Sequence, residues 1–253
     1  MISVVLLGAG NLGQQFFKAL VKNQTLNLIQ WYNRSLGAIK PFSNEVSITD
    51  NLKELKQADI YILAVSDDRI ALLSSALPFE NRLVVHTSGS TSIHDLDKKL
   101  RRGVLYPLQS FTKDRPVDFT NVPLCLEALN KEDYVLLQGI ASGLGSPSYK
   151  ISTEQRKTLH LSAVFVNNFG NQLFRIAHEI SDAQSINFDI LKPLILETAE
   201  KIKEMSPYMA QTGPALRGDK KTVKRHMKQL KDSPHKEVYE LLTKSIQKTH
   251  GKR

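Results

Sequence analysis

Apolar runs of strand length alternate with amphipathic segments through the first part of the chain. Residues 2–8, 26–34 and 58–66 are strand-like, and the third run is nearly continuous, as in strands covered on both faces. Between them, residues 11–23 and 67–77 place apolar side chains at helical spacing. This alternation predicts a parallel, doubly wound sheet.

The pattern changes near residue 152. Before that point we expect four more strands, at residues 82–90, 103–111, 122–129 and 146–152. A helix that ends at a glycine is expected between the last two, at residues 131–145. After it, residues 153–184 contain no proline and keep helical periodicity, and the later segments also indicate helices. The sequence therefore predicts an α/β Rossmann domain with a mostly parallel sheet at residues 1–152, followed by an all-α domain at residues 153–253.

A glycine motif lies between the first strand and the first helix. Gly8, Gly10 and Gly13 fit the pattern G-x-G-x-x-G, with Asn11 and Leu12 inside it. In such a motif the first glycine permits a tight turn, the second lets the backbone approach a pyrophosphate, and the third allows close helix packing. The free N–H groups at the helix start favour phosphate. Because the motif follows a strand and opens a helix, we expect a dinucleotide site.

The end of the second strand indicates which dinucleotide is bound. A site for NAD usually has an acidic residue there, whereas this chain has Asn33, Arg34 and Ser35. Arg34 can bind a 2′-phosphate and stack on adenine, and Ser35 can donate its hydroxyl. We therefore predict NADP. A further strand ends at the same edge of the sheet and adds Ala64, Val65 and Ser66 to the expected cofactor site.

The composition limits the kinds of site and the cellular location that we expect. The single cysteine excludes a disulfide framework and a cysteine-based metal site, and we expect no metal. No stretch approaches the roughly 20 apolar residues of a membrane span, and no signal-peptide pattern is present, so we expect a cytoplasmic protein without membrane contacts.

The charge is uneven along the chain. The net charge of +9 arises in residues 201–253, which hold 14 Lys and Arg against 5 Asp and Glu. The basic stretch at residues 220–231 has no interleaved aromatic residues, so we do not expect nucleic-acid binding. A solvated helix face and attraction of phosphate-bearing small molecules both stay open.

Several of these segments resemble the 6-phosphogluconate dehydrogenase-like superfamily. GAGNLG, NRS and AVSDDRI are similar to the pattern of its members, which include pyrroline-5-carboxylate and ketopantoate reductases and pair a Rossmann domain with a helical domain. VVHTSGS, YPLQSF, LHLSAVFVNNF and TGPALRGD resemble a subgroup of Rossmann-like proteins with a C-terminal domain of unknown function. The resemblance implies NADP binding, oxidoreductase activity, a substrate held between the domains, and a homodimer formed through the helical domain.

The segment HTSGS ends a predicted strand and places two candidate catalytic residues at the cofactor edge. Ser88, with the amide of Gly89, can hold a carboxylate or carbonyl oxygen. His86 can serve as a general acid near neutral pH, or it can be a strand histidine bonded to the backbone. Both interpretations of His86 stay open.

The long helix supplies two more candidate catalytic residues, His160 and Asn168. His160 lies in a segment that resembles the subgroup, although a structural role for it stays open. The β-hydroxyacid dehydrogenases use a lysine and an asparagine one helical turn apart, and this chain has no such pair. Because His160 and Asn168 are eight residues apart, they can share a helix face but not a turn.

The segment TGPALRGD, at residues 212–219, breaks one helix and opens the next. Arg217 can bind a carboxylate or phosphate in a bidentate manner, and we take it as a candidate catalytic-site residue. Asp219 can cap the following helix. An internal pair between Arg217 and Asp219 is the alternative.

Taken together, these residues predict an NADP-dependent oxidoreductase that reduces a small anionic carbonyl or imine substrate. A non-catalytic NADP-binding sensor or regulatory protein is the alternative. A deazaflavin cofactor in place of the nicotinamide also stays open.

Overall fold

The computed structural model describes residues 1–250. These residues belong to two compact units, one formed by Met1–Asn168 and the other beginning at Phe169. No helix among the described residues is long and apolar enough to cross a membrane.

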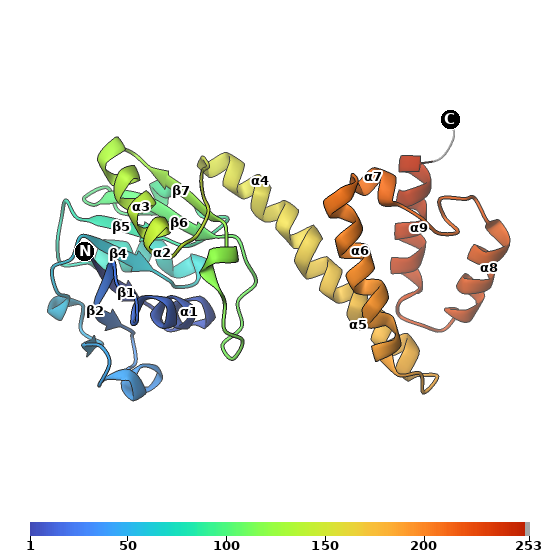
Figure 1. The fold of residues 1–253 in the computed structure, drawn as a ribbon, viewed down its shortest axis with the longest axis horizontal. Coiled ribbons are helices and arrows are strands. Elements are labelled where there is room, and N and C mark those ends of the chain that lie inside the picture. Colours follow the sequence, from blue (N-terminus) through green and yellow to red (C-terminus); the bar gives the residue numbers. More distant parts are fainter. Residues whose placement is uncertain (251–253) are drawn as a thin grey trace. The chain divides into compact units, whose positions relative to one another are not determined.

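The first unit is built on an eight-stranded sheet with the order β3-β2-β1-β4-β5-β6-β7-β8 (Figure 1). All neighbouring pairs are parallel except β6 and β7. The strands are β1 (Ile2–Leu7), β2 (Leu26–Tyr32), β3 (Ile48–Thr49), β4 (Ile60–Leu63), β5 (Leu83–His86), β6 (Arg101–Pro107), β7 (Leu124–Ala128) and β8 (Ser148–Lys150). The predicted Rossmann-type fold, with a mostly parallel sheet, is confirmed.

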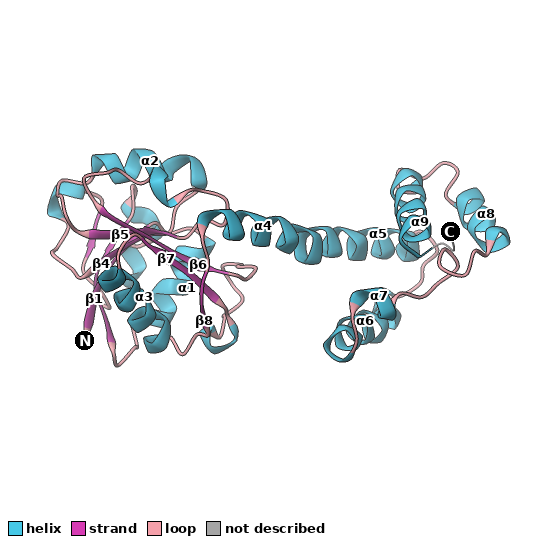
Figure 2. Ribbon diagram, turned by 90° about the horizontal axis from the view of Figure 1, so that it is seen from above, coloured by secondary structure: helices cyan, strands magenta, loops and turns pink. Residues whose placement is uncertain are grey.

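Helices cover both faces of this sheet, as Figure 2 shows. Helices α1 (Asn11–Leu20) and α3 (Lys131–Gly143) pack on one face, and α2 (Asp67–Ala76) packs on the other. Because successive strand residues point to opposite faces, Val4 and Leu6 join the first core while Val5 and Leu7 join the second. The central strands are therefore apolar at nearly every position.

The turn after β1 is held by close backbone packing. Gly8 has a φ of +111°, and a Cβ there would lie 2.2 Å from the carbonyl oxygen of Ala64. The carbonyl oxygen of Gly8 accepts a 2.8 Å hydrogen bond from the buried Nε1–H of Trp31, which stacks on Phe17 of α1. The turn, the second strand and the first helix are thereby fixed together.

The helices after the sheet begin with α4 (Thr153–Ala163), which belongs to the first unit. The sequence predicted helical periodicity over residues 153–184, and the structure has α4 and α5 there, joined by a π-helical segment (Val164–Phe169). The second unit contains α5 (Gly170–Asp182), α6 (Lys192–Glu204), α7 (Pro207–Ala210), α8 (Lys220–Gln229) and α9 (Lys236–His250). A helical C-terminal region is thus present as expected.

The predicted domain boundary after residue 152 falls between β8, which ends at Lys150, and α4, whereas the compact units divide after Asn168. The difference arises because α4 is anchored to the sheet. The side chain of Arg156 is fully buried and forms an ion pair with Glu127 of β7, and its guanidinium also donates to the carbonyl oxygen of Thr91.

Replacing Gly13 tests the close approach of α1 to the glycine turn. An alanine Cβ at this position would lie 2.4 Å from the carbonyl oxygen of Gly8, so the turn or the helix must shift. We expect Gly13→Ala to lower the free energy of unfolding in urea by about 1–3 kcal/mol, with the better helix propensity of alanine offsetting part of the strain.

Gly37→Ala is the matched control, because the nearest atom to its added Cβ is the Ser35 hydroxyl at 3.8 Å. It should change the free energy of unfolding by no more than about 0.5 kcal/mol. Equal stability of the two variants would contradict the packing described for Gly13.

Candidate functional site

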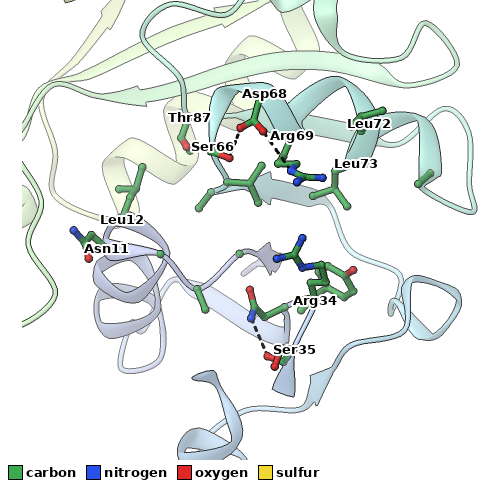
Figure 3. A pocket seen from close by; sticks show the side chains of 18 residues that line it. Asn11, Leu12, Arg34, Ser35, Ser66, Asp68, Arg69, Leu72, Leu73 and Thr87 are labelled. Carbon is green, nitrogen blue, oxygen red and sulfur yellow. Dashed lines mark hydrogen bonds and ion pairs between the residues drawn. The ribbon is translucent and has the colours of Figure 1, made fainter. Parts of the chain in front are cut away.

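A pocket of about 840 Å³ opens at the carboxyl ends of β1, β2 and β4 (Figure 3). This is the edge of a doubly wound sheet at which ligands bind. Its volume lies within the range of small-molecule sites. The pocket is lined by Gly8, Ala9, Gly10, Asn11, Leu12, Tyr32, Asn33, Arg34, Ser35, Ala64, Val65, Ser66, Asp68, Arg69, Leu72, Leu73, Ala76 and Thr87.

The floor of the pocket is the glycine turn. A Cβ built on Gly10 meets no atom within 4 Å, so the backbone at this point is open to a ligand. Asn11 begins α1 and donates its side-chain amide to the carbonyl oxygen of Phe111 at 3.2 Å. Gly13 does not line the pocket but packs beneath it, against the backbone of Gly8.

The second wall comes from the end of β2. The side-chain amide of Asn33 donates to the carbonyl oxygen of Ser35 at 2.8 Å and fixes the turn. Arg34 is exposed and points from this wall toward α2 (Figure 3). Within residues 1–250 its guanidinium has neither a hydrogen bond nor an ion pair, so it is available to an anion.

The third wall is formed by Ser66 and by α2, and of these residues sequence reasoning reached only Ser66. The Ser66 hydroxyl donates to Asp68 at 2.5 Å, and Asp68 pairs with Arg69 at 3.3 Å. Leu72, Leu73 and Ala76 continue the wall and give it an apolar surface. Leu72 and Leu73 lie three and four residues after Arg69, and Ala76 lies three residues after Leu73; this helical spacing is the signal that could have identified them.

The HTSGS segment follows β5, but only Thr87 of it lines the pocket. His86 is fully buried, and its Nδ1 accepts a 3.2 Å hydrogen bond from the amide of Ser88. Burial, together with the guanidinium of Arg156, lowers the pKa of His86 to about 4. The imidazole is therefore neutral near pH 7, which does not suit the general-acid role considered for it.

Ser88 is also buried and shapes the turn. Its Oγ accepts hydrogen bonds from the amides of Ser90 at 3.1 Å and Thr91 at 3.0 Å. The hydroxyl of the neighbouring Ser90 in turn donates to Asp67 at the start of α2. These bonds hold the loop after β5 next to the pocket and occupy the lone pairs of the Ser88 oxygen.

A second group of side chains lies just beyond this loop. The hydroxyl of Tyr106, at the end of β6, lies 3.2 Å from Nδ1 of His160 on α4. The two rings meet edge to face with their centroids 6.1 Å apart. Gly89 lies against both of them, so the structure brings together HTSGS, YPLQSF and the last turn of α4.

The other predicted residues lie elsewhere. Asn168 is exposed in the π-helical segment, and Arg217 is exposed in the second unit. The carboxylate of Asp219 accepts the amide of Thr222 at 3.0 Å and caps α8, as expected. No close ion pair joins Arg217 to Asp219 among residues 1–250, but hydrogen bonds to Thr222 and, to a smaller extent, the charge of Arg217 lower the pKa of Asp219.

Comparison with known proteins gives one family match and many structural matches. Residues 122–246 match the model of a domain of unknown function, DUF2520. No curated protein matches the chain significantly. The candidate NADP oxidoreductase BF3122 of Bacteroides fragilis is 38% identical, covers 98% of both chains and superposes with a TM-score of 0.88.

More distant structures share the fold. The protein TM1727 of Thermotoga maritima is 20% identical over 98% of both chains, with a TM-score of 0.74. A reductive aminase of Aspergillus terreus, solved with NADPH and ethyl-5-oxohexanoate, is 14% identical over 99% of this chain and 96% of its own, with a TM-score of 0.71.

The match to BF3122 extends over nearly the whole chain and includes the DUF2520 region. The chain therefore belongs to the same family of Rossmann-fold proteins as BF3122, with a DUF2520 domain at residues 122–246.

Proposed function

We propose that this protein is an NADP-dependent oxidoreductase that reduces a small anionic carbonyl or imine substrate. One observation carries the proposal: an open glycine backbone and an unpaired arginine line the same pocket at the carboxyl edge of the sheet. A pyrophosphate and a 2′-phosphate are the two anionic parts of NADP, and these groups are their usual partners.

The residues of the pocket fit this cofactor. The space above Gly10 and the amides that open α1 suit the pyrophosphate, since a side chain at Gly10 would fill the approach. Arg34 and Ser35 would hold the 2′-phosphate. The apolar side chains of α2 would cover the adenine, and Thr87 lines the pocket at the end of β5.

The names of the similar structures support this assignment. BF3122 is described as a candidate NADP oxidoreductase, the Aspergillus reductive aminase was solved with NADPH, and an imine reductase of Myxococcus stipitatus was solved with NADP+. A carbonyl or imine is the group that such reductions consume.

When bound, the nicotinamide supplies the hydride. The protein must then orient the substrate and stabilise the charge that develops on its oxygen or nitrogen. We propose that His160, which is partly exposed beside the HTSGS loop, stabilises this developing charge. His86 and Ser88 are proposed to fix the shape of that loop. Arg217, whose guanidinium is exposed, is proposed to bind the anionic group of the substrate. Asn168 is proposed to bind a polar group of the same substrate.

We also propose that the protein is a homodimer whose helical units pack against each other. Among the described residues 169–250, only Ile176, Ser181 and Ala215 are buried. Large apolar side chains of α5, α6 and their neighbours are exposed instead, including Phe174, Ile180, Ile190, Leu194 and Leu196. An apolar surface of this extent is typical of an interface, and a second copy would cover it.

Replacing Arg34 tests the choice of cofactor. We expect Arg34→Ala to raise the Kd for NADPH about 10- to 100-fold, because a charge-assisted contact to the 2′-phosphate is lost. The Kd for NADH should change much less, since NADH lacks that phosphate. Fluorescence titration of both nucleotides measures the two values.

Arg115→Ala is the control, because this arginine is exposed and lies outside the pocket. It should leave both Kd values unchanged. An equal loss of NADPH and NADH affinity in Arg34→Ala would contradict the role of Arg34. NADPH binding without reduction of any keto acid or cyclic imine would favour the non-catalytic alternative.

The oligomeric state is tested by sedimentation equilibrium. The chain has a mass of 28.4 kDa, and we expect the protein to sediment with twice this mass. The dimer should persist on dilution into the micromolar range, because its interface would be largely apolar. A monomeric mass at every concentration would show that a second copy does not cover the apolar surface.

A further inference from the structure

The Tyr106 hydroxyl has a single candidate for its hydrogen bond. The Tyr106 residue is buried, and among residues 1–250 the hydroxyl has one hydrogen-bonding partner, Nδ1 of His160 at 3.2 Å. A buried hydroxyl that donates to nothing costs free energy, and donation to this nitrogen removes that cost. The Nδ1 atom then accepts, and a neutral imidazole carries its proton on Nε2.

The pKa of Tyr106 keeps its hydroxyl protonated and therefore able to donate. Burial raises the pKa of Tyr106 to about 12, with a smaller contribution in the same direction from Cys125. The phenol therefore stays protonated near neutral pH, where it can donate to His160.

The His160 ring is also fixed sterically. A Cβ at Gly89 would lie 2.7 Å from Nδ1 of His160 and 2.9 Å from the phenol ring of Tyr106, so both rings lie directly against the glycine backbone. The helix that carries His160 is anchored one turn earlier, where the buried Arg156 pairs with Glu127. The amide of Thr153 donates to the same carboxylate at 2.9 Å.

The opposite nitrogen of the ring is free. Within residues 1–250, Nε2 of His160 has no hydrogen-bonding partner, and the side chain is partly exposed. Gly89 follows Thr87, which lines the cofactor pocket, by two residues. A fixed N–H donor without a partner thus lies next to the loop that borders the pocket.

From this geometry we infer that Tyr106 is a positioning residue, which fixes His160 in the Nε2–H form so that this N–H binds the substrate oxygen or nitrogen on which negative charge develops. The inference rests on the proposed function and specifies the donor at that site. The imidazole acts as a neutral hydrogen-bond donor, and no bond to it is made or broken; the proton that completes the reduction comes from solvent water.

Nitrogen NMR tests the tautomer independently of any activity. The protein is labelled with ¹⁵N at its seven histidines, and the His160 signals are identified by their absence in His160→Asn. At a pH where the ring is neutral, we expect Nε2 to carry the proton and Nδ1 to show the shift of a hydrogen-bond acceptor. In Tyr106→Phe the Nδ1 signal should move toward that of the exposed His94.

Tyr149→Phe is the matched control, since Tyr149 is exposed on β8 and removal of its hydroxyl should leave the His160 signals unchanged. Thermal unfolding of each variant confirms that it is folded. A proton on Nδ1 in the wild type, or an identical Nδ1 signal in Tyr106→Phe, would overturn the inference.

Kinetics with NADPH and either pyruvate or 1-pyrroline-2-carboxylate tests the consequence for turnover. We expect kcat to fall about 100-fold in His160→Ala and about 10-fold in Tyr106→Phe, whereas the Kd for NADPH stays unchanged in both. A normal kcat in Tyr106→Phe would contradict a positioning role. If the wild type binds no NADPH, the proposed function fails, and the NMR result still decides the tautomer.

Discussion

The backbone contact between the end of β1 and the start of α1 is the constraint on which the rest of the first unit depends. Gly8 turns with a positive φ against the carbonyl group of Ala64, and Gly13 brings α1 down onto the carbonyl oxygen of Gly8. Trp31 donates to that same oxygen from the second strand. Three neighbouring elements thus meet at one peptide group, which leaves the Gly10 backbone facing an open pocket.

The same contact explains why the pocket is suited to a phosphorylated ligand. The first backbone N–H groups of α1 have no acceptor within the helix, as in any α-helix, and packing at Gly8 and Gly13 holds them at the edge of the pocket. The end of β2, aligned beside β1, places Arg34 at the rim of the same cavity. The part of the site that suits phosphate is therefore made of the backbone at the glycine turn and the unpaired guanidinium of Arg34, while α2 adds an apolar wall.

The sequence predicted those features of the structure that depend on a pattern within a short stretch of the chain. The strand and helix periods predicted the sheet, and the spacing of Gly8, Gly10 and Gly13 identified the turn. The third wall was missed beyond Ser66, because the side chains of α2 reach the pocket only through the packing of that helix. The buried pair of Arg156 and Glu127 was also missed, since the partners are far apart in sequence and each resembles an ordinary surface charge. For the same reason, the neutral state of His86 could not be read from the sequence: its burial and its distance from Arg156 are properties of the folded chain.

The most direct test of the central claim is isothermal titration calorimetry of the full chain with NADPH and with NADH. The account predicts one site per chain that binds NADPH in the micromolar range or tighter and NADH more weakly, because only NADPH carries the phosphate that Arg34 would bind. An absence of heat with both nucleotides at millimolar concentration would contradict it.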